Sequence, residues 1–151
     1  MADCRIVTIH KKIAELIGVN FAAGSSGVDM TGRVVRGSTV VPPYTPFACA
    51  FFVEAREDYG PTLGRFQGTA RFDIYCYIGG SSDETRNDNA LNLSSDLIEA
   101  LTNNRQLGLA AGVMDDILCS FTAIDGSKYG LDGIGIGYIQ CDCKFQTDNG
   151  V

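Results

Sequence analysis

Six cysteines and a single histidine are the residues of this 151-residue chain whose side chains could hold a metal ion or start nucleophilic chemistry. No Cys-x-x-Cys pair occurs, and one histidine cannot complete the usual ligand spacing of a structural zinc site. Most of the cysteines stand in apolar, strand-like stretches, and no secretion signal precedes them. We therefore expect reduced thiols that fill the core as small hydrophobic residues. The six are Cys4, Cys49, Cys76, Cys119, Cys141 and Cys143.

Other catalytic patterns fail on spacing or context. His10 stands on the polar side of an amphipathic stretch, and no Gly-x-Ser-x-Gly elbow is present to supply a nucleophile. The glycine-rich segment 130–135 has neither the spacing nor the strand-then-helix context of a dinucleotide turn. Asp115 and Asp116 have no third acidic residue close by in sequence to complete a cation site. The sequence thus predicts no catalytic residue, no cofactor site and no metal site.

The clearest element is a long strand from Gly64 to Ile78. Residues of this segment alternate between apolar or small and polar, and a period of two over this length is typical of a strand with one buried face. We expect Phe66, Phe72 and Ile74 to be buried, and Arg65, Arg71 and Tyr75 to be more exposed. The buried face is predicted to consist of Phe66, Gly68, Ala70, Phe72, Ile74, Cys76 and Ile78, and the polar face to include Tyr77.

Two amphipathic helices are predicted. The first begins at an Asp3 cap, carries isoleucines and a leucine on one stripe between Ile6 and Ile17, and ends at Gly18. The second follows Ser81 and Glu84, which have capping-box spacing, and ends at Asn103-Asn104. Its leucines, Leu97 among them, predict the buried side, whereas its polar remainder, including Asp96 and Glu99, is expected to be solvated. The Gly/Ser-rich stretch 22–29 is expected to be a flexible loop.

Further strands are predicted on both sides of the second helix. They are 30–35, 47–55 with both faces covered, 113–124, and 134–145. Gly133, Gly135 and Gly137, at and just before the start of the last strand, either loosen that end or admit another backbone. A charged turn is expected at 54–60, a loop at 125–130, and a frayed tail from about residue 146. This order predicts an α+β fold over residues 1–151, a mostly antiparallel sheet with two amphipathic helices packed on one face.

Charge is distributed unevenly along the chain. The net charge is −6, but residues 1–72 carry +2 and residues 73–151 carry −8. An acidic total argues against non-specific binding of nucleic acid. The asymmetry would let a weakly basic surface meet an acidic surface on a neighbour, unless both are simply solvated faces. No apolar run approaches the roughly 20 residues that a membrane span needs.

The order of these elements resembles that of one family of phage proteins. An amphipathic helix precedes the strand Gly32-Arg33-Val34-Val35-Arg36-Gly37, and a proline-rich approach leads into the apolar strand that ends near Val53 and Glu54. The long strand ends in Ile74-Tyr75-Cys76-Tyr77, and the leucine-rich helix 91–101 is followed by two strands. From about Ile6 to Phe145 the chain resembles the tail-terminator, or tail-completion, proteins of tailed bacteriophages.

The resemblance implies a structural virion protein with no enzyme activity. Such a subunit forms a homohexameric ring that caps the tail tube, stops its polymerisation and joins it to the head-tail connector in the neck. Genomic DNA would pass through the lumen without specific binding, and no membrane is involved. We take Arg33, Arg36, Arg65 and Arg71 as candidate subunit-interface residues in the basic half. Two alternatives are a head-closure or neck connector protein and a small-molecule-binding or enzymatic α+β domain.

Overall fold

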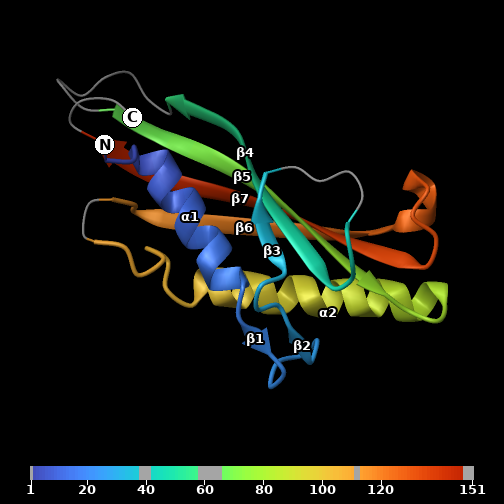
Figure 1. The fold of residues 1–151 in the computed structure, drawn as a ribbon. Coiled ribbons are helices and arrows are strands. Elements are labelled where there is room, and N and C mark those ends of the chain that lie inside the picture. Colours follow the sequence, from blue (N-terminus) through green and yellow to red (C-terminus); the bar gives the residue numbers. More distant parts are fainter. Residues whose placement is uncertain (1, 38–41, 58–65, 111–112, 148–151) are drawn as a thin grey trace.

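The computed structural model describes residues 2–37, 42–57, 66–110 and 113–147, which form two α-helices, a short 3₁₀ helix and seven strands (Figure 1). The elements are α1 (Arg5–Ile17), β1 (Asn20–Phe21), β2 (Val28–Asp29), β3 (Val34–Arg36), β4 (Phe47–Glu57), β5 (Phe66–Gly79), α2 (Asp83–Thr102), β6 (Asp116–Asp125), η1 (Gly126–Tyr129) and β7 (Ile134–Thr147). Neither described α-helix is both long enough and apolar enough to cross a membrane.

Five strands form one sheet in the order β3-β4-β5-β7-β6. All neighbours are antiparallel except β3, which pairs in parallel with the first part of β4. Both helices pack on the same face of this sheet, as Figure 1 shows. The predicted α+β architecture is therefore confirmed, with β1 and β2 added as a small separate hairpin.

The core lies between the helices and the sheet. Ile9, Ile13 and Ile17 of α1 are fully buried, as are Leu93, Leu97 and Leu101 of α2. The alternation of β5 directs Phe72, Ile74 and Cys76 into the same core, as predicted. Arg71 and Tyr75 on the opposite face are only partly exposed. Arg65 lies outside the described residues, and so does the side chain of Phe66.

The other face of the sheet is not uniformly exposed, contrary to the predicted pattern. At one end of it Phe47, Cys49, Tyr77 and Ile136 form a second buried cluster. Leu131, from the turn between η1 and β7, packs against this cluster and helps to cover it. Tyr77, placed on the polar face by the alternation, is buried for this reason. A period of two identifies which residues share a face, but it does not show where a loop folds over that face.

Several predicted boundaries are corrected by one to four residues. Helix α1 is capped at Cys4 without a side-chain hydrogen bond, and Asp3 instead pairs with Lys11 at 2.5 Å. Gly18 ends α1 as predicted. The α2 cap is Ser82 rather than Ser81, because the Ser82 hydroxyl accepts from the Thr85 amide at 3.2 Å. Asn103 ends α2 as expected.

The strands depart from the predicted limits as well. Only residues 47–50 of β4 are fully covered, and the strand continues to Glu57 where a turn was expected from residue 54. The remainder of that turn, 58–60, lies outside the described residues. Strand β3 is limited to Val34–Arg36, and β6 begins at Asp116 rather than residue 113. Segment 126–129 is a 3₁₀ turn, and β7 includes residues 146 and 147, which were expected to be frayed.

The glycines of β7 let a second backbone come close, which was one of the two predicted reasons for them. A Cβ at Gly135 would overlap the Arg86 carbonyl of α2, and one at Gly137 would overlap the Ser94 hydroxyl and the Cys76 sulfur. Helix α2 therefore packs directly on the β7 backbone.

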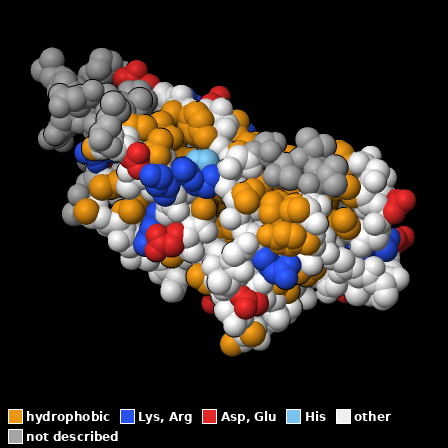
Figure 2. Space-filling view, viewed as in Figure 1, with side chains coloured by type: hydrophobic (Ala, Val, Ile, Leu, Met, Phe, Trp, Pro, Cys, Tyr) orange, Lys and Arg blue, Asp and Glu red, His pale blue; other side chains and the backbone are white. Residues whose placement is uncertain are grey.

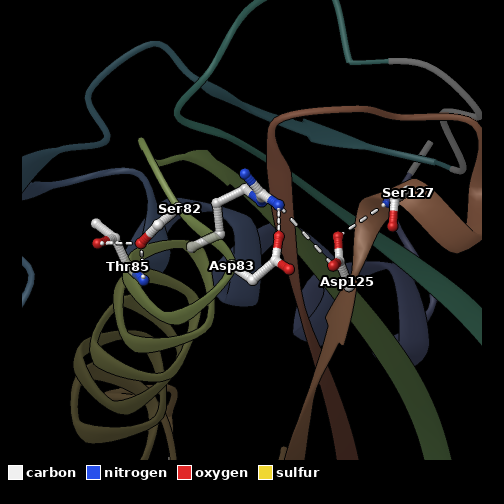
Figure 3. A network of polar contacts seen from close by, with 6 residues as sticks. Ser82, Asp83, Thr85, Asp125 and Ser127 are labelled. Carbon is white, nitrogen blue, oxygen red and sulfur yellow. Dashed lines mark hydrogen bonds and ion pairs between the residues drawn. The ribbon is translucent and has the colours of Figure 1, made fainter.

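The beginning of α2 is also tied to the end of β6, as Figure 3 shows. The Arg86 guanidinium forms ion pairs with Asp83 and, at 4.0 Å, with Asp125. Asp125 in turn accepts from the Ser127 amide at 3.1 Å. These contacts hold the beginning of α2 against the end of β6.

Candidate interaction surface

His10 is held as a structural residue. Its Nε2 lies 2.7 Å from the Ala50 carbonyl, to which it must donate because a carbonyl only accepts, and its ring lies 5.2 Å from that of Phe72. Burial is the largest influence on His10 and lowers its pKa, because it disfavours the charged imidazole. The hydrogen bond to Ala50 raises this pKa, and the nearby positive charge of Arg36 lowers it. The imidazole is thus kept neutral and engaged in packing.

Asp115 and Asp116 do not form a cation site with their neighbours. The Asp116 carboxylate accepts from the Ile117 amide at 2.8 Å and pairs with Arg105 at 3.5 Å. Within the described residues no group of three or more His, Cys, Asp or Glu side chains is placed to hold a metal ion.

The helix-free face of the sheet carries a row of aromatic rings. Phe51 of β4 stacks on Tyr75 of β5 with ring centroids 5.6 Å apart, and Tyr75 lies 5.1 Å from Tyr138 of β7. The side chains are partly buried against one another. Sequence reasoning placed Tyr75 and Tyr138 on polar faces but did not bring them together, because that requires the β5–β7 register.

Arg71, one of the candidate interface residues, is engaged within this face. Its Nε donates to Asp73 at 3.2 Å and its Nη2 donates to the Tyr138 hydroxyl at 2.9 Å, while that hydroxyl donates to Asp73 at 2.8 Å. The hydrogen bond with Tyr138, followed by the one with Asp73, raises the pKa of Arg71. Burial, followed by the hydrogen bond to Asp73, raises the pKa of Tyr138. The charge of Arg71 is therefore already compensated within its own sheet face.

Charge is balanced across the rest of this face. Arg71 lies in register with Glu54 on one side and with Asp142 on the other. Two residues further along the strands, Arg56 and Lys144 flank Thr69, and Lys144 donates to the Thr69 hydroxyl at 2.8 Å. Among the described residues of this face, the three cations are matched by Glu54, Asp73 and Asp142, so the face gives no support to nucleic-acid binding.

Two of the other candidate arginines, Arg33 and Arg36, lie at an edge of the sheet, away from Arg71. Arg33 donates to the Pro46 carbonyl at 3.2 Å and stands 5.0 Å from the centre of the Tyr44 ring. Arg36 is exposed at the end of β3, close enough to His10 to influence its pKa. The structure thus places Arg33 and Arg36 on one surface and Arg71 on another, and Arg65 lies outside the described residues.

The edge formed by β3 and β4, here called the basic edge, is only partly paired. β3 covers Ala48 to Ala50 of β4, and no described strand pairs with the outer side of β4 beyond that point. Val35, Phe52 and Val53 are exposed along this edge, each by 41–42%. Figure 2 shows this side of the molecule, where lysine and arginine side chains lie beside the single histidine and hydrophobic side chains flank them.

The opposite edge is β6, here called the acidic edge, which pairs only with β7 among the described strands. Leu118 is 51% exposed and Phe121 is 42% exposed on it. The described segments around it, α2 to the turn after η1 (82–110 and 113–132), contain nine acidic and three basic residues, a net −6. The described segments that form and flank the basic edge, 2–37 and 42–57, contain five acidic and six basic residues, a net +1. Both edges are therefore apolar in part, and their surroundings are opposite in charge.

The polar groups of one surface hollow are already paired within the chain. The one between the β1–β2 hairpin and α2, about 290 Å³, includes Asp96. That carboxylate is only 3% exposed and accepts from the Ser25 amide at 3.0 Å, the Ser26 amide at 2.8 Å and the Ser26 hydroxyl at 2.6 Å. The prediction of a solvated Asp96 was therefore wrong, and the predicted loop is held to α2 through Ser25 and Ser26 and leads into β2 at residue 28. The long-range contact between the loop and Asp96 had no local signal in the sequence.

No protein-family model matches the sequence, and no curated protein matches it.

Proposed function

We propose that this chain is a ring-forming structural subunit that acts as a tail terminator of a tailed bacteriophage. The ring would cap the tail tube, stop its polymerisation and join it to the head-tail connector. The order of elements from Ile6 to Phe145, which resembles that family, and the α+β fold with both helices on one face support this proposal.

The observation that carries the proposal is the difference between the two sheet edges. A ring built from one kind of subunit needs two unlike surfaces that meet head to tail, so that rotation closes the assembly. The basic edge offers Val35, Phe52 and Val53, and the acidic edge offers Leu118 and Phe121. Exposed apolar side chains on an unpaired edge strand favour contact with another chain.

Electrostatics supports the same pairing. The positive surroundings of β3 and the negative surroundings of β6 would attract each other and would disfavour contact between two identical edges. The charge-balanced face between the edges contributes no affinity for phosphates, which suits DNA passing through a ring without specific binding.

The first test is the assembly state in solution. Multi-angle light scattering and native mass spectrometry of the purified chain should find a closed ring, of six subunits by the resemblance. The ring should loosen as salt rises, because exposed charges are screened over about 8 Å near physiological ionic strength. Arg36→Glu should weaken the ring more than Glu99→Lys does, because Glu99 lies beside the hairpin hollow on α2 and not on either edge strand. A chain that stays monomeric at every salt and protein concentration would contradict the proposal.

The second test separates a terminator from other virion connectors. In an infection that lacks this protein, we expect separate heads and tails, with tails that are overlong or fail to join. Complementation with Glu99→Lys should restore infectious particles, and Arg36→Glu should restore few. Tails of normal length together with heads that lose DNA would instead identify a head-closure protein. Normal particles made without this protein would exclude both roles.

A further inference from the structure

Cys119 and Cys141 form the closest pair of thiols among the described residues. They are register partners on β6 and β7, and their sulfur atoms lie 3.5 Å apart. All six cysteines are free, as predicted, and Cys141 is fully buried while Cys119 remains partly exposed. Among the other four, Cys4 is exposed on the N-terminal segment, and Cys49, Cys76 and Cys143 are buried.

We propose that Cys119 and Cys141 are an oxidisable dithiol that a peroxide converts to a disulfide, joining the edge strand β6 covalently to β7. The proposal is independent of ring formation, since it concerns two strands of one chain.

The backbone is already placed for this bond. Directly opposed residues in an antiparallel pair have Cα atoms about 4.5–5.5 Å apart, which falls within the range of disulfide-linked cysteines. The two sulfur atoms need to approach from 3.5 Å to the ~2.05 Å of a disulfide, a change that side-chain rotation can supply.

The two thiols differ in the way that such a reaction requires. The hydrogen bond with Cys141 is the largest influence on Cys119, and it lowers the pKa of the Cys119 thiol. The positive charge of Arg105 also lowers this pKa, whereas burial and the negative charge of Asp142 raise it. Arg105 is fixed beside the strand by donating to the Ile117 carbonyl at 2.8 Å. The same hydrogen bond and burial raise the pKa of Cys141. Cys119, the partly exposed member of the pair and the one with the lowered pKa, is therefore the attacking sulfur, and the buried Cys141 is the resolving thiol.

The reaction balances with hydrogen peroxide as the oxidant. The Cys119 thiolate attacks one peroxide oxygen, the O–O bond breaks, and the departing hydroxide takes up a proton to leave as water, which gives a sulfenic acid. The Cys141 sulfur then attacks the Cys119 sulfur, its proton leaves with the departing hydroxide as a second water, and the S–S bond forms. Two thiols lose two electrons and two protons, and one peroxide becomes two waters.

Oxidation would fix the edge strand that carries Leu118 and Phe121. If the proposed function holds, release of particles from the host would move this pair from a reducing to an oxidising medium. That consequence alone relies on the proposed function, and the test below does not.

The test uses the full chain with Cys4→Ser, which removes the exposed thiol and leaves five. After stepwise treatment with hydrogen peroxide, alkylation under denaturing, non-reducing conditions should count three free thiols. Peptide mapping should find one link, between Cys119 and Cys141. Adding Cys119→Ser should abolish the link and keep four thiols.

A trapping experiment identifies the attacking sulfur. With Cys141→Ala, dimedone should label Cys119 as a sulfenic acid and no disulfide should form, whereas with Cys119→Ser, Cys141 should stay unlabelled. The core-facing variants Cys141→Ala and Cys119→Ser could fold poorly. Peptide mapping of the disulfide in the chain that carries only Cys4→Ser does not depend on them, so it still tests the proposal. Five free thiols at peroxide doses that oxidise glutathione, or a link at any other pair, would overturn the proposal.

Discussion

The imidazole of His10 is held inside the fold by one hydrogen bond and one ring contact, and this makes stability depend on pH. Its folded-state pKa lies below its ordinary value, mainly because burial disfavours the charged form. The unfolded chain therefore binds the proton more readily, so His10 lowers stability as pH falls below about 6.5, the ordinary histidine value. Above that pH both states are neutral at this residue and the effect is absent.

His10→Gln tests this directly, because glutamine can still donate to the Ala50 carbonyl but does not titrate. Denaturant titrations at pH 7.5 and pH 5.5 should show a smaller loss of unfolding free energy for His10→Gln than for the unmodified chain. Both chains contain the same carboxylates, so the difference between their losses of unfolding free energy reports the titration of His10 alone. Equal losses in the two chains would mean that the pKa of His10 is the same in the folded and the unfolded chain, so that burial does not shift it.

The Asp96 carboxylate supports a prediction about the hairpin. Asp96→Asn replaces one accepting oxygen by an NH₂ group that would face backbone or hydroxyl donors of Ser25 and Ser26. A buried donor left unsatisfied costs about 1–3 kcal/mol of unfolding free energy. Hydrogen exchange should also quicken in residues 20–29, where the hairpin is held.

Asp88→Asn is the matched control, because it makes the same change on an exposed position of α2. It should alter stability by less than about 0.5 kcal/mol. If both variants behave alike, the three hydrogen bonds to Asp96 contribute little to the fold.

Single residues of this chain could be predicted where the pattern is local. The burial of Phe72, Ile74 and Leu97 follows from strand and helix periodicity. The burial of Asp96 could not be predicted, since its partners lie 70 and 71 residues earlier in the chain. The pairing of Cys119 with Cys141 was missed for a similar reason, because strand register is a property of the folded sheet.

Strands and helices set the distances between the candidate surfaces. The close packing of α2 on β7 at Gly135 and Gly137 determines how near the acidic helix lies to the β6 edge. The order of the main elements and the helix faces follow from the sequence, which left two reasons open for these glycines. The β1–β2 hairpin and the parallel pairing of β3 with β4 do not, because strands of two or three residues are too short for a periodic pattern.

Gly137→Ala should destabilise the fold by about 1–3 kcal/mol, since its Cβ would overlap Ser94 and Cys76 in a filled core. Gly79→Ala is the control, because a Cβ there would lie 3.8 Å from its nearest neighbours, an ordinary contact. Thermal and denaturant unfolding of both variants measures the difference. A Gly137→Ala chain as stable as Gly79→Ala would show that α2 can shift away from β7 without cost.

The whole molecule presents two unlike edges on opposite sides of a charge-balanced sheet face. The basic first half of the sequence supplies α1 and β3 beside one edge, and the acidic second half supplies α2 near the other edge. The charge asymmetry along the sequence thus becomes a charge difference between the two edges. Sequence alone could suggest unlike surfaces. Only the strand order shows that they are the two ends of one sheet, and that Arg71 belongs to neither.

Mixing two defective variants tests the head-to-tail arrangement most directly. Val35→Asp with Arg36→Glu would disable the basic edge, and Asp115→Lys with Leu118→Lys would disable the acidic edge. At a concentration where the unmodified chain forms rings, native mass spectrometry should find each variant alone as a monomer. An equimolar mixture should give heterodimers and nothing larger, because each dimer retains one working interface and no second one. A variant that still forms rings or homodimers, or a mixture that stays monomeric, would contradict assembly through these two edges.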